Sequence, residues 1–222
     1  MTVDDLVMQF RSDADDALLP YLWSSTEVMR WLNEAQHEAA LRSRLLLETS
    51  DPTITQIALQ VGVLTYKLHS SVFELTSIRY KATGDNYSCP VTLVTRKELD
   101  QISPGWRDQT NNRPPKYVFQ DEKTLTLTQA PIATGTIYLE AFRLPLIALD
   151  GGAKEPEINA AHHRHLVKWM LHRAFSKPDA ETMDPQRAER SEKEFTRYFG
   201  LRPDAGLRRE TQSNTPQHNR AW

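Results

Sequence analysis

The sequence predicts an α+β protein with a helical bundle formed by the N- and C-terminal helices, a β-rich insert between them and an extended C-terminal arm. Apolar residues recur at helical spacing in residues 1–50 and again in residues 157–200. In residues 53–146, apolar and polar residues alternate with the period of two that is typical of strands. Residues 201–222 show neither period, so we expect them to form the arm.

The first helix is expected to begin after Thr2, which can cap it, and to end before Pro20. Its apolar stripe consists of Val3, Leu6, Val7, Phe10, Ala14, Ala17 and Leu18. The opposite face carries the aspartates Asp4, Asp5, Asp13, Asp15 and Asp16. These residues lack the glycine and glutamate positions of a calcium loop, so they predict a solvated acidic face or a patch for a basic partner.

A second helix is predicted to begin after Ser24, because Ser24 and Glu27 have the spacing of a capping box. Apolar residues then follow at helical spacing at Val28, Leu32, Ala35 and Ala39. Asp51–Pro52 is expected to end this helix, because the residue before a proline disfavours helical geometry.

The insert is expected to contain strands joined in hairpins. The predicted strands are residues 57–63, 72–80, 87–94, 117–120, 124–129 and 136–142. Turns are expected at residues 84–86 and 121–123. One helical turn is expected at residues 95–100, and a loop at residues 103–115 surrounds Trp106.

Two further helices are expected after the insert. The third spans residues 157–176, with Val167, Met170, Leu171 and Ala174 on one face. The fourth begins at Asp184–Pro185, an N-cap followed by proline at the first helical position. Its inward residues are Ala188, Ser191, Phe195 and Phe199, and Gly200 ends it.

The composition is that of an ordinary globular protein, with 25% charged and 39% apolar residues in 222. No apolar run is long enough to cross a membrane, so no membrane partner is expected. The net charge of −2 gives no general attraction to nucleic acid. Cys89 is the only cysteine, which excludes an internal disulfide and a multi-cysteine zinc site.

Histidines on the third helix are the strongest candidates for metal ligands. His162, His165, Trp169 and His172 fall on one stripe, and two histidines at i, i+3 can chelate a metal ion. Because no cysteine or close carboxylate completes the set, a polar or interface stripe is favoured, and neither a metal nor a cofactor is expected. The sequence also lacks a phosphate-binding glycine loop, G-x-S-x-G and H-E-x-x-H, so no catalytic residue is assigned.

Two tryptophans lie in segments that are suited to contact a partner. Trp106 lies in a loop, and Trp222 can anchor the arm in a partner's groove. A terminus without a role is an equal alternative for Trp222. The arm also carries Arg208, Arg209 and Arg220. Their charge is thinly spread, so an acidic protein surface is a better match than nucleic acid.

Several sequence segments occur in the same order as in a known protein family. They are PYLWSSTEVMRWLNEAQHEAALRSRLL, QVGVLTYKL, LVTRKELDQISPGWRD, RPPKYVFQDEKTLTLTQAP, YLEAFRLPL and EINAAHHRHLVKWMLHRAFSKPDAETMDPQRAERSEKEFTRYFG. In their order and spacing, which extend to Gly200, they resemble the head-to-tail adaptor proteins of tailed bacteriophages, also called head completion or neck proteins.

The resemblance implies a structural virion protein, made in the host bacterial cytoplasm, and not an enzyme. Such adaptors form a ring, usually of twelve copies, under the portal protein, and the tail or nozzle protein attaches to them while DNA passes through without specific binding. Residues 1–50 and 157–200 would dock on the portal, residues 53–146 would face the tail, and residues 201–222 would run into a portal crevice. We expect a free monomer that assembles with its own copies on the portal.

The resemblance also gives roles to the candidate residues. Arg208, Arg209, Arg220, Trp222 and Trp106 would contact partners. Asp13, Asp15 and Asp16 would form a channel wall that does not hold the passing DNA. Two alternatives remain open, a virion-associated cell-wall hydrolase and a DNA-binding protein. The first needs a carboxylate or histidine site in a cleft, and the second needs a basic recognition helix.

Overall fold

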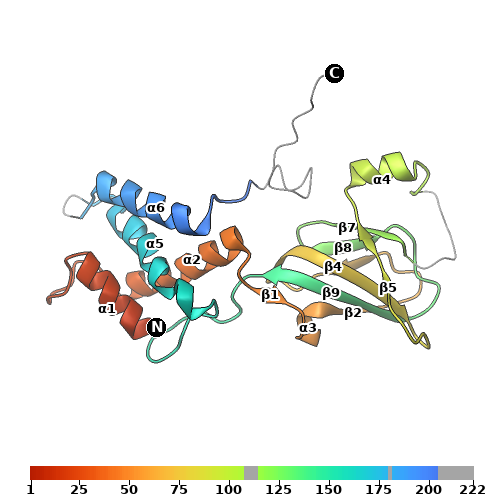
Figure 1. Ribbon diagram of the computed structural model, residues 1–222, viewed down its shortest axis with the longest axis horizontal. Helices are drawn as coiled ribbons and strands as arrows, with labels where there is room; N and C mark the ends of the chain where they lie inside the picture. Colours follow the sequence, from red (N-terminus) through yellow and green to blue (C-terminus); the bar gives the residue numbers. More distant parts are fainter. Residues whose placement is uncertain (108–114, 180–181, 205–222) are drawn as a thin grey trace, which may run out of the picture. The chain divides into compact units, whose positions relative to one another are not determined.

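A computed structural model describes residues 1–107, 115–179 and 182–204 and confirms the α+β class (Figure 1). The chain divides into two compact units, each with its own core. The helical unit consists of Met1–Leu46 and Leu144–Arg202, and the β unit consists of Leu47–Arg143, to which the described residues Pro203 and Asp204 are also assigned. Across the described ranges, no helix has both the length and the apolar character that crossing a membrane requires.

The helical unit joins segments from both ends of the chain in one core. Its helices are α1 (Val3–Asp13), α2 (Ser25–Ser43), α5 (His163–Phe175) and α6 (Pro185–Phe199), with a 3-10 turn at Ala160–His162 before α5. α1, α2 and α6 each pack against α5. Aromatic rings link the two halves, because Trp23 contacts both Phe10 and Phe175 edge to face at centroid distances of 5.8 and 5.6 Å.

Three of the four predicted helix starts are confirmed by the cap hydrogen bonds. The Glu27 amide donates to the Ser24 hydroxyl, and the Ser24 amide donates to the Glu27 carboxylate. The same reciprocal pair forms between Thr2 and Asp5 at the start of α1. The Asp184 carboxylate accepts from two amides at the start of α6. The predicted inward residues of α6, from Ala188 to Phe199, are buried.

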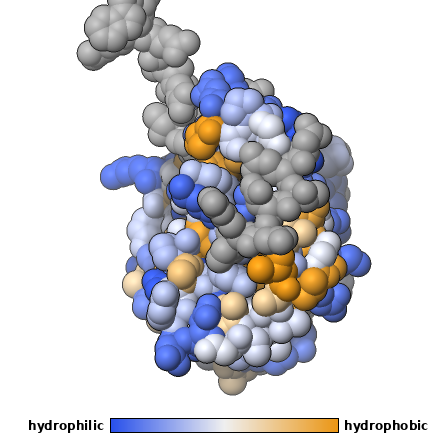
Figure 2. All heavy atoms as spheres, turned by 90° about the vertical axis from the view of Figure 1, so that its right-hand side faces the viewer, coloured by the Kyte–Doolittle hydropathy of each residue, from blue (hydrophilic) through white to orange (hydrophobic). Residues whose placement is uncertain are grey.

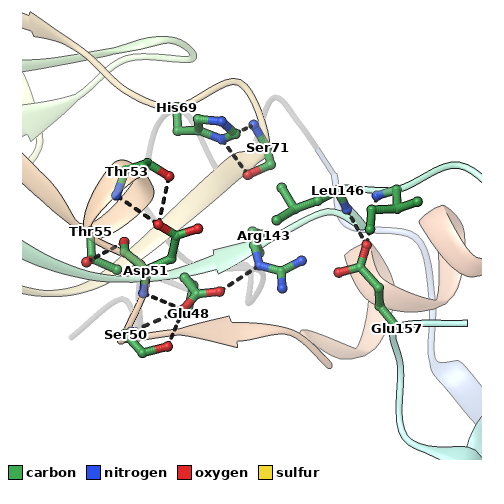
Figure 3. A network of polar contacts seen from close by, with 11 residues as sticks. Glu48, Ser50, Asp51, Thr53, Thr55, His69, Ser71, Arg143, Leu146 and Glu157 are labelled. Atoms are coloured by element: carbon green, nitrogen blue, oxygen red, sulfur yellow. Dashed lines mark hydrogen bonds and ion pairs between the residues drawn. The ribbon is translucent and has the colours of Figure 1, made fainter.

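Two predicted helix ends and one predicted helix start are wrong. α1 ends at Asp13 because Asp15 adopts a left-handed conformation with φ of 60°, and the predicted stripe residue Leu18 is 84% exposed. α2 ends at Ser43, where Arg44 is left-handed, and Asp51 instead caps the short helix α3 (Pro52–Thr55). The α-helix expected from residue 157 begins at His163, because the Glu157 carboxylate accepts from the amides of Leu146 and Ile147 (Figure 3).

The β unit consists of two sheets that share one core. The first sheet has the order β1 (Leu47–Glu48), β9 (Gly135–Arg143), β4 (Val72–Ala82) and β5 (Cys89–Pro90), and β2 (Gln56–Leu59) also pairs with β9. The second has the order β3 (Thr65–Lys67), β8 (Thr124–Leu127), β7 (Tyr117–Gln120) and β6 (Thr92–Leu93). The helix α4 (Arg96–Ile102) follows β6.

The second predicted hairpin is confirmed, and the first is correct only in part. β7 and β8 pair in antiparallel register, and the Asp121 amide donates to the Thr124 carbonyl in the turn. β4 pairs only with Cys89 and Pro90 of the predicted second strand. Pro90 has no amide hydrogen, and after Val91 the chain joins the other sheet, where β6 lies parallel to β7.

Candidate interaction surfaces

The segment between α1 and α2 presents a group of apolar side chains to solvent. We call Leu18–Leu22 the projecting loop; its residues are Leu18, Leu19, Pro20, Tyr21 and Leu22. Leu18 and Leu19 are 84% and 78% exposed, and Leu22 is 53% exposed. Sequence reasoning assigned Leu18 to the buried stripe of α1, so it missed this feature. The run LLPYL after a group of aspartates was the available signal.

A buried ion pair fixes both ends of the projecting loop. The Arg11 guanidinium lies 2.5 Å from the Asp16 carboxylate, and both side chains are almost fully buried. The second carboxylate oxygen of Asp16 accepts from the Leu22 amide at 2.7 Å. Arg11 also donates to the Trp23 carbonyl and lies over the Tyr21 ring, 3.6 Å from its centroid. These contacts define the path of the loop.

The three aspartates predicted to form one acidic patch have different environments. Asp16 is only 3% exposed and is paired with Arg11, so it does not belong to a solvated face. Asp13 and Asp15 are exposed. The Asp15 carboxylate lies 3.4 Å from the Arg187 guanidinium, which also donates to the Asp13 carbonyl. Of these three aspartates, only Asp13 and Asp15 are therefore exposed, and Asp4 and Asp5 of the predicted acidic face are exposed as well.

Trp106 lines a cavity in the β unit. Its ring packs edge to face on Phe119 at 5.7 Å, and its indole nitrogen donates to the Asp100 carboxylate at 2.8 Å. The cavity has a volume of about 360 Å³. It is lined by Cys89, Pro90, Leu99, Ser103, Trp106, Pro115, Lys116, Tyr117, Thr128 and Gln129. Trp106 is thus part of a concave surface that can receive a side chain.

The histidine stripe of α5 packs against α6. The His165 ring stacks on Tyr198 with centroids 3.5 Å apart, and His162 Nδ1 lies 3.1 Å from the Tyr198 hydroxyl. His172 Nδ1 lies 3.1 Å from the Ala188 carbonyl oxygen. Burial, and then the nearby cation of Arg164, lower the pKa of His165. Within the described part of the chain, no three His, Cys, Asp or Glu side chains are grouped as metal ligands.

A second carboxylate network closes the β unit where the chain enters and leaves it (Figure 3). One Glu48 oxygen accepts from the amides of Ser50 and Asp51, and the other accepts from the Arg143 guanidinium at 3.0 Å. The backbone amides, with Arg143 and the Ser50 hydroxyl, lower the pKa of Glu48 to about 2. Sequence reasoning did not find this pair, because Glu48 and Arg143 lie at opposite ends of the unit's sequence.

One end of the β unit is apolar. The loop after β2 and the loop before β9 meet there, since the Gly62 amide donates to the Pro131 carbonyl at 2.9 Å. Val61, Leu64 and Ile132 are 59%, 43% and 56% exposed in these loops. Figure 2 looks onto this end of the unit and shows hydrophobic side chains gathered on the surface. This apolar end is a second candidate contact surface.

The remaining predicted interface residues, Arg208, Arg209, Arg220 and Trp222, lie outside the described residues. Leu201–Asp204, which precede them, form neither helix nor strand. Arg202 places its guanidinium 3.3 Å from the Glu38 carboxylate of α2. The partner contacts of the arm and of Trp106 stay predictions.

The sequence matches a family of known proteins over almost its whole length. A family model described as SU10 adaptor protein matches residues 1–220, a range that includes the helical unit and the β unit. No curated protein matches the chain. The family match agrees with the resemblance seen in the sequence phrases, and it covers far more than half of the chain. The chain therefore belongs to the SU10 adaptor protein family, a family of phage head-to-tail adaptors.

Proposed function

We propose that the chain is a structural component of the phage neck that binds the portal protein and provides the surface on which the tail or nozzle protein assembles. The observation that carries this proposal is the family match over residues 1–220. It favours a structural role over the hydrolase and DNA-binding alternatives. In the virion, further copies of the chain form a ring, usually of twelve, through which DNA passes; the free chain is a monomer.

The two units divide these contacts. The helical unit docks on the portal, and residues 201–222 follow it into a portal crevice with Arg208, Arg209, Arg220 and Trp222 as contacts. The β unit faces the tail. Its apolar end at Val61, Leu64 and Ile132 supports this assignment, because contiguous exposed apolar groups mark interaction sites.

The portal contact is tested by sedimentation of the full chain with the portal ring of its own phage. We expect the chain to sediment slowly alone, to join the portal ring in a fixed ratio, and to lose this binding when residues 201–222 are removed. Folding of the shortened chain is checked by circular dichroism. A full-length chain that never joins the ring would contradict the proposed function. A shortened chain that binds as well as the full chain would contradict only the role of the arm.

We propose two alternative roles for the exposed aspartates Asp13 and Asp15: they contact a neighbouring copy, or they face the DNA channel, where their negative charge prevents the passing DNA from adhering. In the channel role, the double variant Asp13→Asn/Asp15→Asn is expected to reduce the fraction of genomes that virions eject. Glu189→Gln/Glu192→Gln on α6 removes the same charge elsewhere in the helical unit and is expected to have no effect. Equal packaging and ejection in the channel variant and wild type would show that these aspartates do not line the channel.

A further inference from the structure

The projecting loop is held in a fixed shape although its apolar side chains face water. Exposed apolar surface is unfavourable in water, and contiguous exposed apolar groups mark sites of protein contact. Leu18 and Leu19 are among the most exposed large apolar side chains of the described residues. Their exposure requires an explanation beyond the folding of the helical unit.

The buried ion pair behind the loop supports a role in binding. A buried ion pair contributes little net stability, because the desolvation of both charges offsets their attraction. The Arg11–Asp16 pair instead sets geometry, since it holds the Leu22 amide and the Trp23 carbonyl at the end of the loop. A loop that is already ordered loses little conformational entropy when a partner covers it. The helical unit thus presents a preorganised apolar projection with two exposed carboxylates, Asp13 and Asp15, beside it.

The Trp106 cavity of the β unit has the complementary chemistry. Its apolar lining includes Leu99, Trp106 and Tyr117, and among the described lining residues the charged one is the exposed cation Lys116. The Asp100 carboxylate that accepts from the Trp106 indole is already paired with Arg107. A volume of about 360 Å³ lies within the range of about 300–1,000 Å³ that is typical of ligand pockets. It is therefore large enough for leucine side chains, and Lys116 attracts an acidic neighbour.

We propose that the projecting loop of one copy inserts Leu18 and Leu19 into the Trp106 cavity of a second copy, with Asp13 and Asp15 of the first copy near Lys116 of the second. The loop and the cavity are different surfaces, so the contact is heterologous. Heterologous contacts that close on themselves generate rings. The inference rests on the proposed function, because it identifies which surfaces join neighbouring copies in the ring.

The sole cysteine of the chain makes this contact testable. Cys89 is exposed and lines the cavity. The variant Leu19→Cys/Cys89→Ser and the wild-type chain carry tags of different length, so that a gel separates them. Both are mixed with the portal ring of the same phage. A disulfide between them requires Cβ atoms about 3.5–4.5 Å apart, so mild oxidation reports direct proximity. We expect a mixed disulfide dimer on non-reducing gels. Met8→Cys/Cys89→Ser, with an exposed residue of α1 replaced, is the matched control and is expected to form none.

Charge reversal tests the same contact without a cysteine. Lys116→Glu is expected to reduce the number of copies bound per portal ring at least tenfold at low salt, and Asp13→Lys/Asp15→Lys is expected to restore binding to that variant. The inference is overturned if the wild-type chain joins the portal, no mixed disulfide forms and Lys116→Glu binds as well as wild type. The proposed role in the neck would then still stand. A Leu19→Cys disulfide to the portal instead of to Cys89 also overturns the inference. Wild-type chain that never joins the portal overturns both.

Discussion

Replacement of Asp16 with alanine is expected to lower the free energy of unfolding of the helical unit by about 3–5 kcal/mol, because it leaves the Arg11 guanidinium buried without its counter-charge. The same substitution removes the acceptor of the Leu22 amide. With typical total stabilities of about 5–15 kcal/mol, the loss is a large fraction of the whole. Denaturant unfolding followed by the fluorescence of Trp23 and Trp31, both buried in the helical core, measures it.

Asp15→Asn is the matched control for this effect, because asparagine removes the charge and tolerates the left-handed conformation of residue 15. The Asp15 carboxylate is 83% exposed and 3.4 Å from Arg187, so its loss is expected to change stability by no more than about 0.5 kcal/mol. The double variant Arg11→Met/Asp16→Ala is expected to cost less than the sum of the two single changes, because neither buried charge is then left alone. Equal effects of Asp15→Asn and Asp16→Ala would show that Asp16 is solvated, as the sequence pattern alone predicts.

Three of the four helix starts were predictable because they depend on residues close in sequence. Ser24 and Glu27 are three positions apart, and each side chain accepts from the other residue's backbone amide. The sequence spacing therefore directly predicts the capping hydrogen bonds. The β7–β8 hairpin was predictable for the same reason, since its turn spans three residues between strands of alternating character. Local rules therefore suffice to predict these elements.

The end of α1 was not predictable from helical periodicity, because a side-chain ion pair and the backbone conformation after Asp13 decide it. Leu18 continues the apolar period of α1, so helical spacing alone places it in the core. The helix stops because Asp16 turns inward to Arg11 and accepts from the Leu22 amide. Helical periodicity contains no information about this carboxylate. The projecting loop was missed for that reason, although Asp13, Asp15 and Trp106 were identified as candidate residues.

The sheets show the same limit at longer range. β9 pairs with β1, β2 and β4, which precede it by more than fifty residues, and the sequence reveals none of these registers. The strand predicted at residues 87–94 is divided between the two sheets at Val91. One continuous strand and two short strands in different sheets both fit the alternation of apolar and polar residues. Which residues face a common cavity follows from these pairings, so the Trp106 cavity was beyond reach of the sequence.

Replacement of Glu48 with glutamine is expected to destabilise the β unit at neutral pH and to remove part of its acid sensitivity. Glu48 has a pKa of about 2 in the folded chain against an ordinary value of 4.5. Because the folded pKa is depressed, its contribution is fully present above pH 4.5 and is lost as the pH falls toward 2. The full shift corresponds to about 3 kcal/mol, and solvent screening near the surface reduces the expected value to about 2 kcal/mol.

The difference in unfolding free energy between wild type and Glu48→Gln reports the contribution of this carboxylate alone, because the other carboxylates that titrate in the same pH range are present in both proteins. Unfolding free energies are measured from pH 7 to pH 2 through the fluorescence of Trp106, which lies in the β unit. The difference is expected to be about 2 kcal/mol at pH 7 and to fall below about 0.5 kcal/mol near pH 2, where about half of the wild-type carboxylates are protonated. Glu140→Gln, an exposed position on β9, is expected to follow wild type throughout. A difference that stays constant with pH would mean that Glu48 acts through packing. Unfolding free energies that converge at low pH would show that the charge of Glu48 joins the first and last strands of the unit through Arg143 and two backbone amides.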